Sequence, residues 1–190
     1  GDRRVSQVQT ELAGRLLSLY RINKTEGWNW FEDKLTYCNA ALSQAMLTCG
    51  KDMSNPEMIT IGIDSLSWLA KLQHSDHENH FIPIGSNGFF PQGGERARFD
   101  QQPVEAQAMV SACLEAYRIT KDEKWHTEAR HTFEWFLGRN DLHLLVYDPT
   151  TGGCRDGLHP DRLNENQGAE STLAFLQSLL ELQLAENIIP

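Results

Sequence analysis

One segment of the sequence is apolar on nearly every face that a helix would have. Between Gln102 and Thr120 most side chains are small and apolar, namely Val104, Ala106, Ala108, Met109, Val110, Ala112, Cys113, Leu114 and Ala116. A helix that is apolar all round is buried by neighbours on several sides. Residues 102–120 therefore predict an inner helix of a domain built from several helices.

Four other segments also have helical signals. Residues 4–22 carry one apolar stripe and predict an amphipathic helix, whereas residues 39–49 and 169–186 are rich in apolar side chains and predict further inner helices. Residues 55–72 begin with Asn-Pro, which is typical of a helix cap followed by the first helical position.

A sixth helix follows the inner segment after the short connection Lys121-Asp122. It is marked on one face by Trp125, Ala129, Phe133 and Phe136, and its other face is polar. An inner helix followed closely by an outer one is an αα-hairpin. The expected fold is therefore all-α, with about six helices arranged mostly in inner and outer pairs.

Two stretches interrupt the helical pattern. Near residues 81–90, Phe81–Ile84 and Phe89–Phe90 flank a Gly-Ser-Asn-Gly turn, which predicts a short β-hairpin or an extended loop. Residues 138–162 form a long irregular connection. Long connections inside a compact domain are more often functional than accidental.

Three histidines, His74, His77 and His80, follow a helix end at regular spacing. Such spacing can indicate a metal site. The segment is highly polar, however, and we interpret it as a solvated loop. The sequence analysis thus predicts no metal and no other cofactor.

Composition excludes several classes of function. The chain has 190 residues, enough for a single domain with a core, and its net charge is −9. An acidic protein is a poor binder of nucleic acid or of an anionic membrane surface. No apolar stretch is long enough to span a bilayer. The four cysteines lack metal-type spacing and predict free thiols, hence a reducing compartment and a cytoplasmic location.

Three stretches dense in hydrogen-bonding groups precede the predicted inner helices: residues 28–33, 99–105 and 164–172. Polar groups at the mouth of a helix cap free N–H groups or bind a polar ligand. We expect the three mouths to converge on one face. Trp28 and Trp30 in the first stretch have two interpretations, a hydrophobic plug over the end of the bundle or a platform on which a sugar stacks.

Four motifs together point to a known family. They are W-x-W-F-E-D-x-L-T-Y-x-N-A at residues 28–40, F-D-Q-Q-P-V-E-A at 99–106, W-F-L-G-R-N-D at 135–141 and N-Q-G-A-E-S-T at 166–172. These motifs resemble the α/α-toroid domain found C-terminal to bacterial mannosyltransferase-like glycosyltransferase modules. The likeness runs from about residue 25 to 185. The family pattern usually has an acidic residue at the position of Cys38, so one polar wall of the cavity is expected to be weaker here.

The resemblance implies a single toroid-like domain over residues 1–190. A complete toroid of this kind has six hairpins, so the chain is expected to be a fragment or a half. Its partner would be a glycosyltransferase module, since the sequence has no nucleotide-binding glycine motif of its own, or a second copy in a homodimer. An incomplete toroid is expected to leave an apolar face of its inner helices exposed.

Three functions follow from these observations. The first is carbohydrate binding, or an accessory role, in a bacterial glycosyltransferase system. The second is cleavage or modification of a glycan by a pair of carboxylates, and the third is a structural or oligomerisation half-domain without ligand. Amide and carboxylate groups suit the first because they form the many hydrogen bonds that sugar hydroxyls need. The candidate substrate-binding residues are Trp28, Trp30, Asp33, Tyr37, Asn39, Gln101, Gln102, Glu105, Asn140, Asp156, Asn166 and Gln167.

Catalysis would require two carboxyl groups across a cleft. The candidate catalytic residues are Glu170, Asp100 and Glu32, with Glu105 and Asp156 as further carboxylates. The dipole of a helix N-terminus favours an ionised carboxylate, so Glu170 and Asp100 would act as bases rather than acids. The alternative for both is helix capping. A serine hydrolase is disfavoured because the Gly-x-Ser-x-Gly motif is absent.

Overall fold

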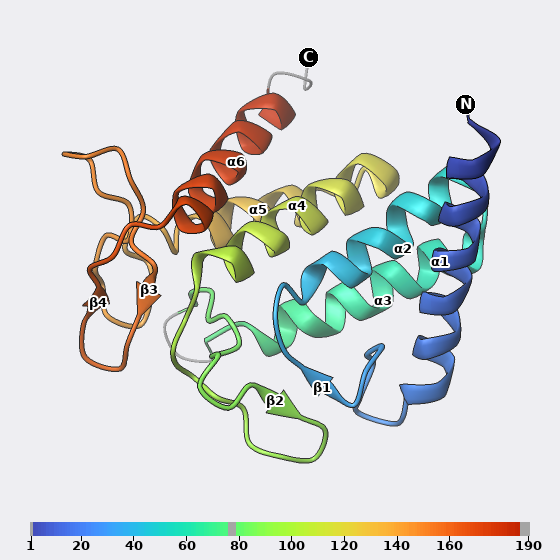
Figure 1. Cartoon of the computed structure of the whole chain (residues 1–190), viewed down its shortest axis with the longest axis horizontal. Coiled ribbons are helices and arrows are strands. Elements are labelled where there is room, and N and C mark those ends of the chain that lie inside the picture. The colour runs from blue at the N-terminus through green and yellow to red at the C-terminus, as the bar shows by residue number, and fades with distance from the viewer. Residues whose placement is uncertain (1, 76–78, 187–190) are drawn as a thin grey trace.

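The computed structural model describes residues 2–75 and 79–186, and these residues form six helices (Figure 1). The all-α prediction is confirmed. The helices are α1 (Arg3–Asn23), α2 (Ala40–Asp52), α3 (Pro56–Leu72), α4 (Pro103–Thr120), α5 (Glu123–Phe133) and α6 (Ala169–Glu186).

Helix α4 lies at the centre of the arrangement. It packs against α2 on one side and α6 on the other, and α5 folds back along it (Figure 1). Helix α3 folds back along α2 in the same way, and α1 flanks α2 at one edge. The helices therefore form an arc in which α2, α4 and α6 are inner and α1, α3 and α5 are outer.

Local chemistry sets the ends of these helices. The Oδ1 atom of Asn55 accepts from the backbone N–H groups of Glu57 and Met58 at 3.0 and 3.2 Å, so this side chain caps α3 as its position before Pro56 predicted. Helix α4 stops at Lys121, which has a left-handed backbone with φ of 58°. Only Lys121 and Asp122 then separate the end of α4 from the start of α5.

The core confirms that α4 is an inner helix. The buried residues of α4 are Pro103, Glu105, Ala106, Ala108, Met109, Val110, Ser111, Ala112, Cys113, Leu114 and Ala116, so nearly all faces are covered. Helices α2 and α3 pack tightly at Gly62. A Cβ atom there would lie 2.7 Å from Cγ of Leu47, so only glycine allows this packing.

The extended segment near residues 81–90 pairs differently from the prediction. Its strand β2 (Phe90–Pro91) pairs antiparallel with β1 (Lys34–Leu35), far away in sequence, and not with Phe81–Ile84. Phe81 instead makes a single bridge to His74. Of the two predicted alternatives, the segment forms the extended loop and not the local β-hairpin. The side chains of both Phe81 and Leu35 are buried, and burial against the helices outweighs the local turn preference.

The helix expected to include Phe136 ends earlier, at Phe133. Residues 134–138 form turns, and the side chain of Asn140 explains the stop because its Nδ2 atom donates to the carbonyl of Trp135 at 2.8 Å. Phe136 is nevertheless buried, as its apolar spacing predicted.

The solvated histidine loop is also corrected. His80 is only 2% exposed and its Nε2 atom donates to Asp141 Oδ1 at 2.7 Å, and His74 is half-buried beside Glu128. Both histidines are therefore packed and paired. The prediction for His77 lies outside the described residues.

The long connection between α5 and α6 contains a hairpin that the sequence analysis missed. Strand β3 (Gly157–Leu158) pairs with β4 (Leu163–Asn164), and Leu158 also bridges to Gln101 just before α4. Gly157 is required there, because a Cβ atom would lie 2.0 Å from the carbonyl oxygen of Gln101. This hairpin brings residues 154–168 to the mouth of α4.

Both ends of the arc expose apolar side chains. On α6 these are Leu173, Leu176, Leu180 and Leu184, and on α1 they are Val5, Val8, Leu12, Leu19 and Ile22. The expected exposed apolar face of an inner helix is therefore confirmed for α6. None of the helices in the described part of the chain is long and apolar enough to cross a membrane. All four cysteines carry free thiols, as predicted.

Candidate functional site

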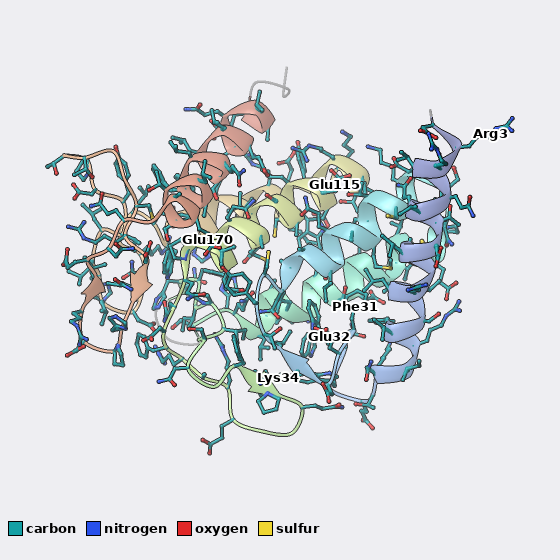
Figure 2. All side chains as sticks on the ribbon, in the orientation of Figure 1. Arg3, Phe31, Glu32, Lys34, Glu115 and Glu170 are labelled. Atoms are coloured by element: carbon teal, nitrogen blue, oxygen red, sulfur yellow. The ribbon has the colours of Figure 1, made fainter. Side chains whose placement is uncertain are left out.

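The mouths of the three inner helices converge, as expected, and two contacts join them. Glu105 in the first turn of α4 accepts hydrogen bonds from residues 38–39, which begin α2. The hydroxyl of Tyr37 donates to Glu170 Oε1 at the start of α6, at 2.6 Å. In Figure 2 the labelled Glu170 marks this mouth. Residues from three separate parts of the sequence thus share one face.

A pocket of about 290 Å³ opens between the mouths of α4 and α6. Such a volume is at the lower end of the range for small-molecule sites. Polar groups make up much of the lining, together with the start of both helices. The lining residues are Gln102, Pro103, Asp156, Asn164, Gly168, Ala169, Glu170 and Ser171.

Asp156 holds one wall of the pocket in place. Its Oδ1 atom accepts from the backbone N–H of Gly168 at 2.8 Å and from the hydroxyl of Ser171 at 2.6 Å, and its Oδ2 atom accepts from the side chain of Asn166. Burial alone would raise the pKa of Asp156, but these hydrogen bonds lower it below its usual value. Asp156 is therefore an ionised cap of α6 supplied by the β3–β4 hairpin.

Glu105 is the buried carboxyl group of the site, with an exposed fraction of 3%. It accepts from the backbone N–H of Cys38, from the Asn39 N–H at 3.4 Å and from Asn39 Nδ2 at 2.9 Å. Burial raises the pKa of Glu105 to about 7, against the lowering effect of these hydrogen bonds. The residue ties α4 to α2 and is closed off from solvent.

Glu170 and Tyr37 form the accessible part of the site. Tyr37 is 46% exposed and Glu170 is also exposed. Partial burial and the hydrogen bond to Glu170 raise the pKa of Tyr37, so its hydroxyl remains a donor. The capping alternative for Glu170 is not what the structure shows, because Asp156 caps α6 and Glu170 reaches across to Tyr37.

The two tryptophans do not form an exposed platform. Trp28 is 4% exposed and Trp30 is fully buried, and both pack against Trp68, with ring centroids 5.1 and 5.9 Å away. The plug interpretation is confirmed and the sugar-stacking interpretation is wrong. Large aromatic rings close to a helix end stabilise the fold most when their apolar surface is removed from water.

Glu32 and Asp33 lie apart from the pocket. Both are exposed beside strand β1, and Figure 2 shows Glu32 well away from Glu170. Glu32 therefore does not share this pocket with Glu170. Asp100 is closer to the site but accepts from His159 Nδ1 at 2.7 Å, which links it to the end of β3.

Several other predicted contact residues stabilise loops. Gln101 is fully buried between Trp135 Nε1, at 2.9 Å, and Asp141 Oδ2, at 2.7 Å. Asn140 is fully buried and binds the backbone of its own turn. Gln167 bridges Thr151 and Asp148 in the long connection. These three residues thus support the site without lining it.

The sequence analysis missed part of the lining. Asn164, Pro103 and Ser171 line the pocket but were not candidates, although all three lie within the stretches that were singled out. Asp148 was also missed. Its carboxylate accepts from Thr150 and Gln167 and so organises the connection, a role for which an Asp-Pro-Thr turn is a recognisable signal.

Comparisons with known proteins give the fold. No family model matches the sequence, and no curated protein matches it. Among solved structures, the chain is similar to a GH76 α-mannanase of Bacteroides thetaiotaomicron, with a TM-score of 0.58 and 14% sequence identity. The match covers 78% of this chain and 35% of the mannanase chain, so the chain spans about a third of that structure. At this identity the likeness shows the architecture, and the described residues form an α/α-toroid-like fold.

Proposed function

We propose that this chain binds carbohydrate at the joined mouths of α2, α4 and α6. The observation that carries the proposal is the pocket of about 290 Å³ lined by Glu170, Gln102 and Asn164, with the hydroxyl of Tyr37 bonded to Glu170. Carboxylate, hydroxyl and amide groups supply the acceptors and donors that pair with sugar hydroxyls. The similar fold of an α-mannanase, a protein that acts on a polysaccharide, supports a sugar as the ligand.

Binding is better supported than cleavage. Glycoside hydrolysis needs two carboxyl groups that are free to act on a bond between them. Asp156 already accepts from three groups, and Glu105 is 3% exposed and bonded to the start of α2. The lining thus offers Glu170 and one further carboxylate, Asp156, which is held by the hydrogen bonds at the start of α6.

The role within a larger system follows from the resemblance in the four motifs. A carbohydrate-binding toroid beside a glycosyltransferase module would hold the acceptor or product glycan. We propose this accessory role as the context of the site. The bacterial source and the cytoplasmic location remain predictions with it.

We expect a thermal-shift screen against mono- and oligosaccharides to find a sugar that stabilises the chain. A ligand bound only by the folded state at 100 times its dissociation constant adds about 2.7 kcal/mol, or roughly 5–10 °C in Tm for a chain of this size. Glu170→Ala removes the acceptor at the rim and should abolish the shift. Tyr37→Phe removes one hydroxyl and should reduce it. Every stabilising sugar is also analysed for products.

Glu95→Ala is the matched control, because Glu95 is exposed, carries the same charge and lies outside the pocket lining. It should leave the shift unchanged. A shift that persists in Glu170→Ala would contradict the proposed site. Formation of product would replace binding by cleavage.

A specific observation favours a second candidate, assembly of a larger ring. The described part of the chain contains the outer helix α1, the hairpins α2–α3 and α4–α5, and the inner helix α6, in this order. Both end helices expose apolar stripes. Their charges are opposite: α1 has four arginines and one glutamate, net +3, and α6 has three glutamates and no basic residue, net −3.

We propose that α1 of one copy packs against α6 of a second copy. Two-fold symmetry would repeat the contact and give six inner–outer pairs from two chains, the number in a closed toroid of this kind. Light scattering after size exclusion should then give twice the 21.6 kDa of one chain. Leu180→Lys, at a residue that is 56% exposed on α6, should weaken the dimer at least about 100-fold.

Leu145→Lys is the control, since Leu145 is similarly exposed, at 49%, but lies in the connection between α5 and α6. It should leave the mass doubled. If the unmodified chain is a monomer at 100 µM, the proposed dimer is contradicted. The exposed apolar stripes of α1 and α6 would then pack against helical hairpins of another polypeptide segment.

A further inference from the structure

Three potential metal ligands meet where the end of α3 packs against α5, away from the sugar pocket. They are His74, Glu128 and His131, and one ligand atom from each lies within 4.8 Å of the other two. Glu128 and His131 are three residues apart on α5 and so share a face. His74 follows the end of α3, and its Nε2 atom lies 2.8 and 3.1 Å from the two carboxylate oxygens of Glu128.

His131 has a buried nitrogen that the protein leaves unused. Its Nε2 atom finds no hydrogen-bond partner among residues 2–75 and 79–186. The imidazole rings of His74 and His131 are stacked, with centroids 5.2 Å apart and planes 23° from parallel. A buried polar atom without a partner is costly, and a metal ion would supply the missing bond.

The donor set and the spacing fit zinc. Two imidazole nitrogens and one carboxylate oxygen are a common Zn²⁺ set that leaves a fourth position for water. Bonds of about 2.0–2.1 Å in a tetrahedron place ligand atoms roughly 3.3 Å apart. Zinc binding would slightly lengthen the distance of 2.8 Å between His74 Nε2 and the Glu128 carboxylate, and it would shorten the distances from these two groups to His131.

The solvent access and the local charge at these three residues are also compatible with a bound cation. The side chains of His74 and Glu128 are 26% and 20% exposed, so solvent reaches one side of the group. The positive charge of Arg139 acts on both histidines, and its guanidinium pairs with Glu134 at 2.6 Å. The carboxylate of Glu128 therefore faces two imidazoles, as in a zinc site.

We propose that His74, Glu128 and His131 bind one zinc ion that fastens the end of α3 to α5. The histidine spacing 74-77-80 suggested a different set in the sequence. The fold instead pairs His80 with Asp141 and brings His74 to α5. A zinc ion here would cross-link the end of α3 to α5 outside the lining of the sugar pocket.

The test uses the whole chain after removal of metals with EDTA. Titration with Zn²⁺ should give one equivalent bound and raise Tm by about 5–10 °C at 100 times the dissociation constant. Co²⁺ in place of zinc should give the visible absorption of a four-coordinate site. His131→Gln, and separately Glu128→Gln, should weaken binding at least about 100-fold and remove the absorption, since each removes one of only three protein ligands.

His143→Gln is the matched control, since His143 is exposed and outside the cluster. It should bind zinc as the unmodified chain does. The two cluster variants distinguish lost ligation from lost folding, because circular dichroism should show both still helical. Absence of stoichiometric zinc binding, or zinc binding that is unchanged in His131→Gln, would overturn the proposal.

Discussion

Replacing Asp141 by alanine is expected to lower the free energy of unfolding by about 3–5 kcal/mol, the usual cost of removing one partner from a buried charged network. The side chain of Asp141 is 3% exposed. Its oxygens accept from His80 Nε2 at 2.7 Å, from two nitrogens of Arg98 at 2.8 and 2.9 Å and from Gln101 Nε2 at 2.7 Å. Alanine would remove the acceptor of the buried His80 and Gln101 side chains, whereas Arg98 is 59% exposed and water can solvate it.

The loss of the Asp141 carboxylate would also affect the proposed sugar site. Gln101 precedes the start of α4 and holds Trp135, so releasing it loosens the support of Gln102 at the pocket rim. Urea unfolding should show the lower stability, and Tm should fall by roughly 10 °C or more. Asp161→Ala is the control, because its ion pair with Arg162 is exposed and contributes little. A loss below about 1 kcal/mol for Asp141→Ala would show that the network does not support the fold.

Stability should fall by roughly 3 kcal/mol between pH 4.5 and 7 because of Glu105 alone. The pKa of Glu105 is raised from 4.5 to about 7 in the folded chain, and each pKa unit corresponds to about 1.4 kcal/mol. In this window the folded state binds the proton and the unfolded state has released it. Since the folded state holds more protons, raising the pH favours unfolding. Below pH 4.5 Glu105 is protonated in both the folded and the unfolded state. The two states then bind the same number of protons, so the contribution of Glu105 to stability no longer changes with pH.

Glu105→Gln isolates this effect, because glutamine keeps the shape and cannot titrate. The measured quantity is the unfolding free energy of the unmodified chain minus that of the variant, at pH 5 and at pH 8. The pKa of His74 is raised by its hydrogen bond to Glu128, but it titrates in both proteins and cancels. A difference that is the same at both pH values would mean that Glu105 titrates at its ordinary value.

Local sequence signals predicted the helices well. Asn55-Pro56 gave the start of α3, and the apolar faces of residues 102–120 correctly marked α4 as the central inner helix. These features depend on neighbours within one or two turns. The convergence of the N-terminal ends of α2, α4 and α6 was also predictable, because a stretch rich in hydrogen-bonding side chains precedes each of these inner helices.

Long-range contacts account for what the sequence analysis missed. Asp156 caps α6 from a hairpin twelve residues before Gly168, and β2 pairs with a strand more than fifty residues away. The three-dimensional packing also decides whether Trp30 faces solvent or core, since both outcomes have the same local sequence. The metal cluster combines His74 with a helix that begins at Glu123, and no local pattern links them.

The most direct test of the proposed sugar site is an NMR titration of the ¹⁵N-labelled chain with a sugar that stabilises it. Our account predicts saturable shifts in the amide signals of Tyr37, Gln102, Gly168, Ala169 and Ser171, and none in those of α1. Shifts confined to α1, or no saturable shift at the helix mouths, would contradict carbohydrate binding at this site.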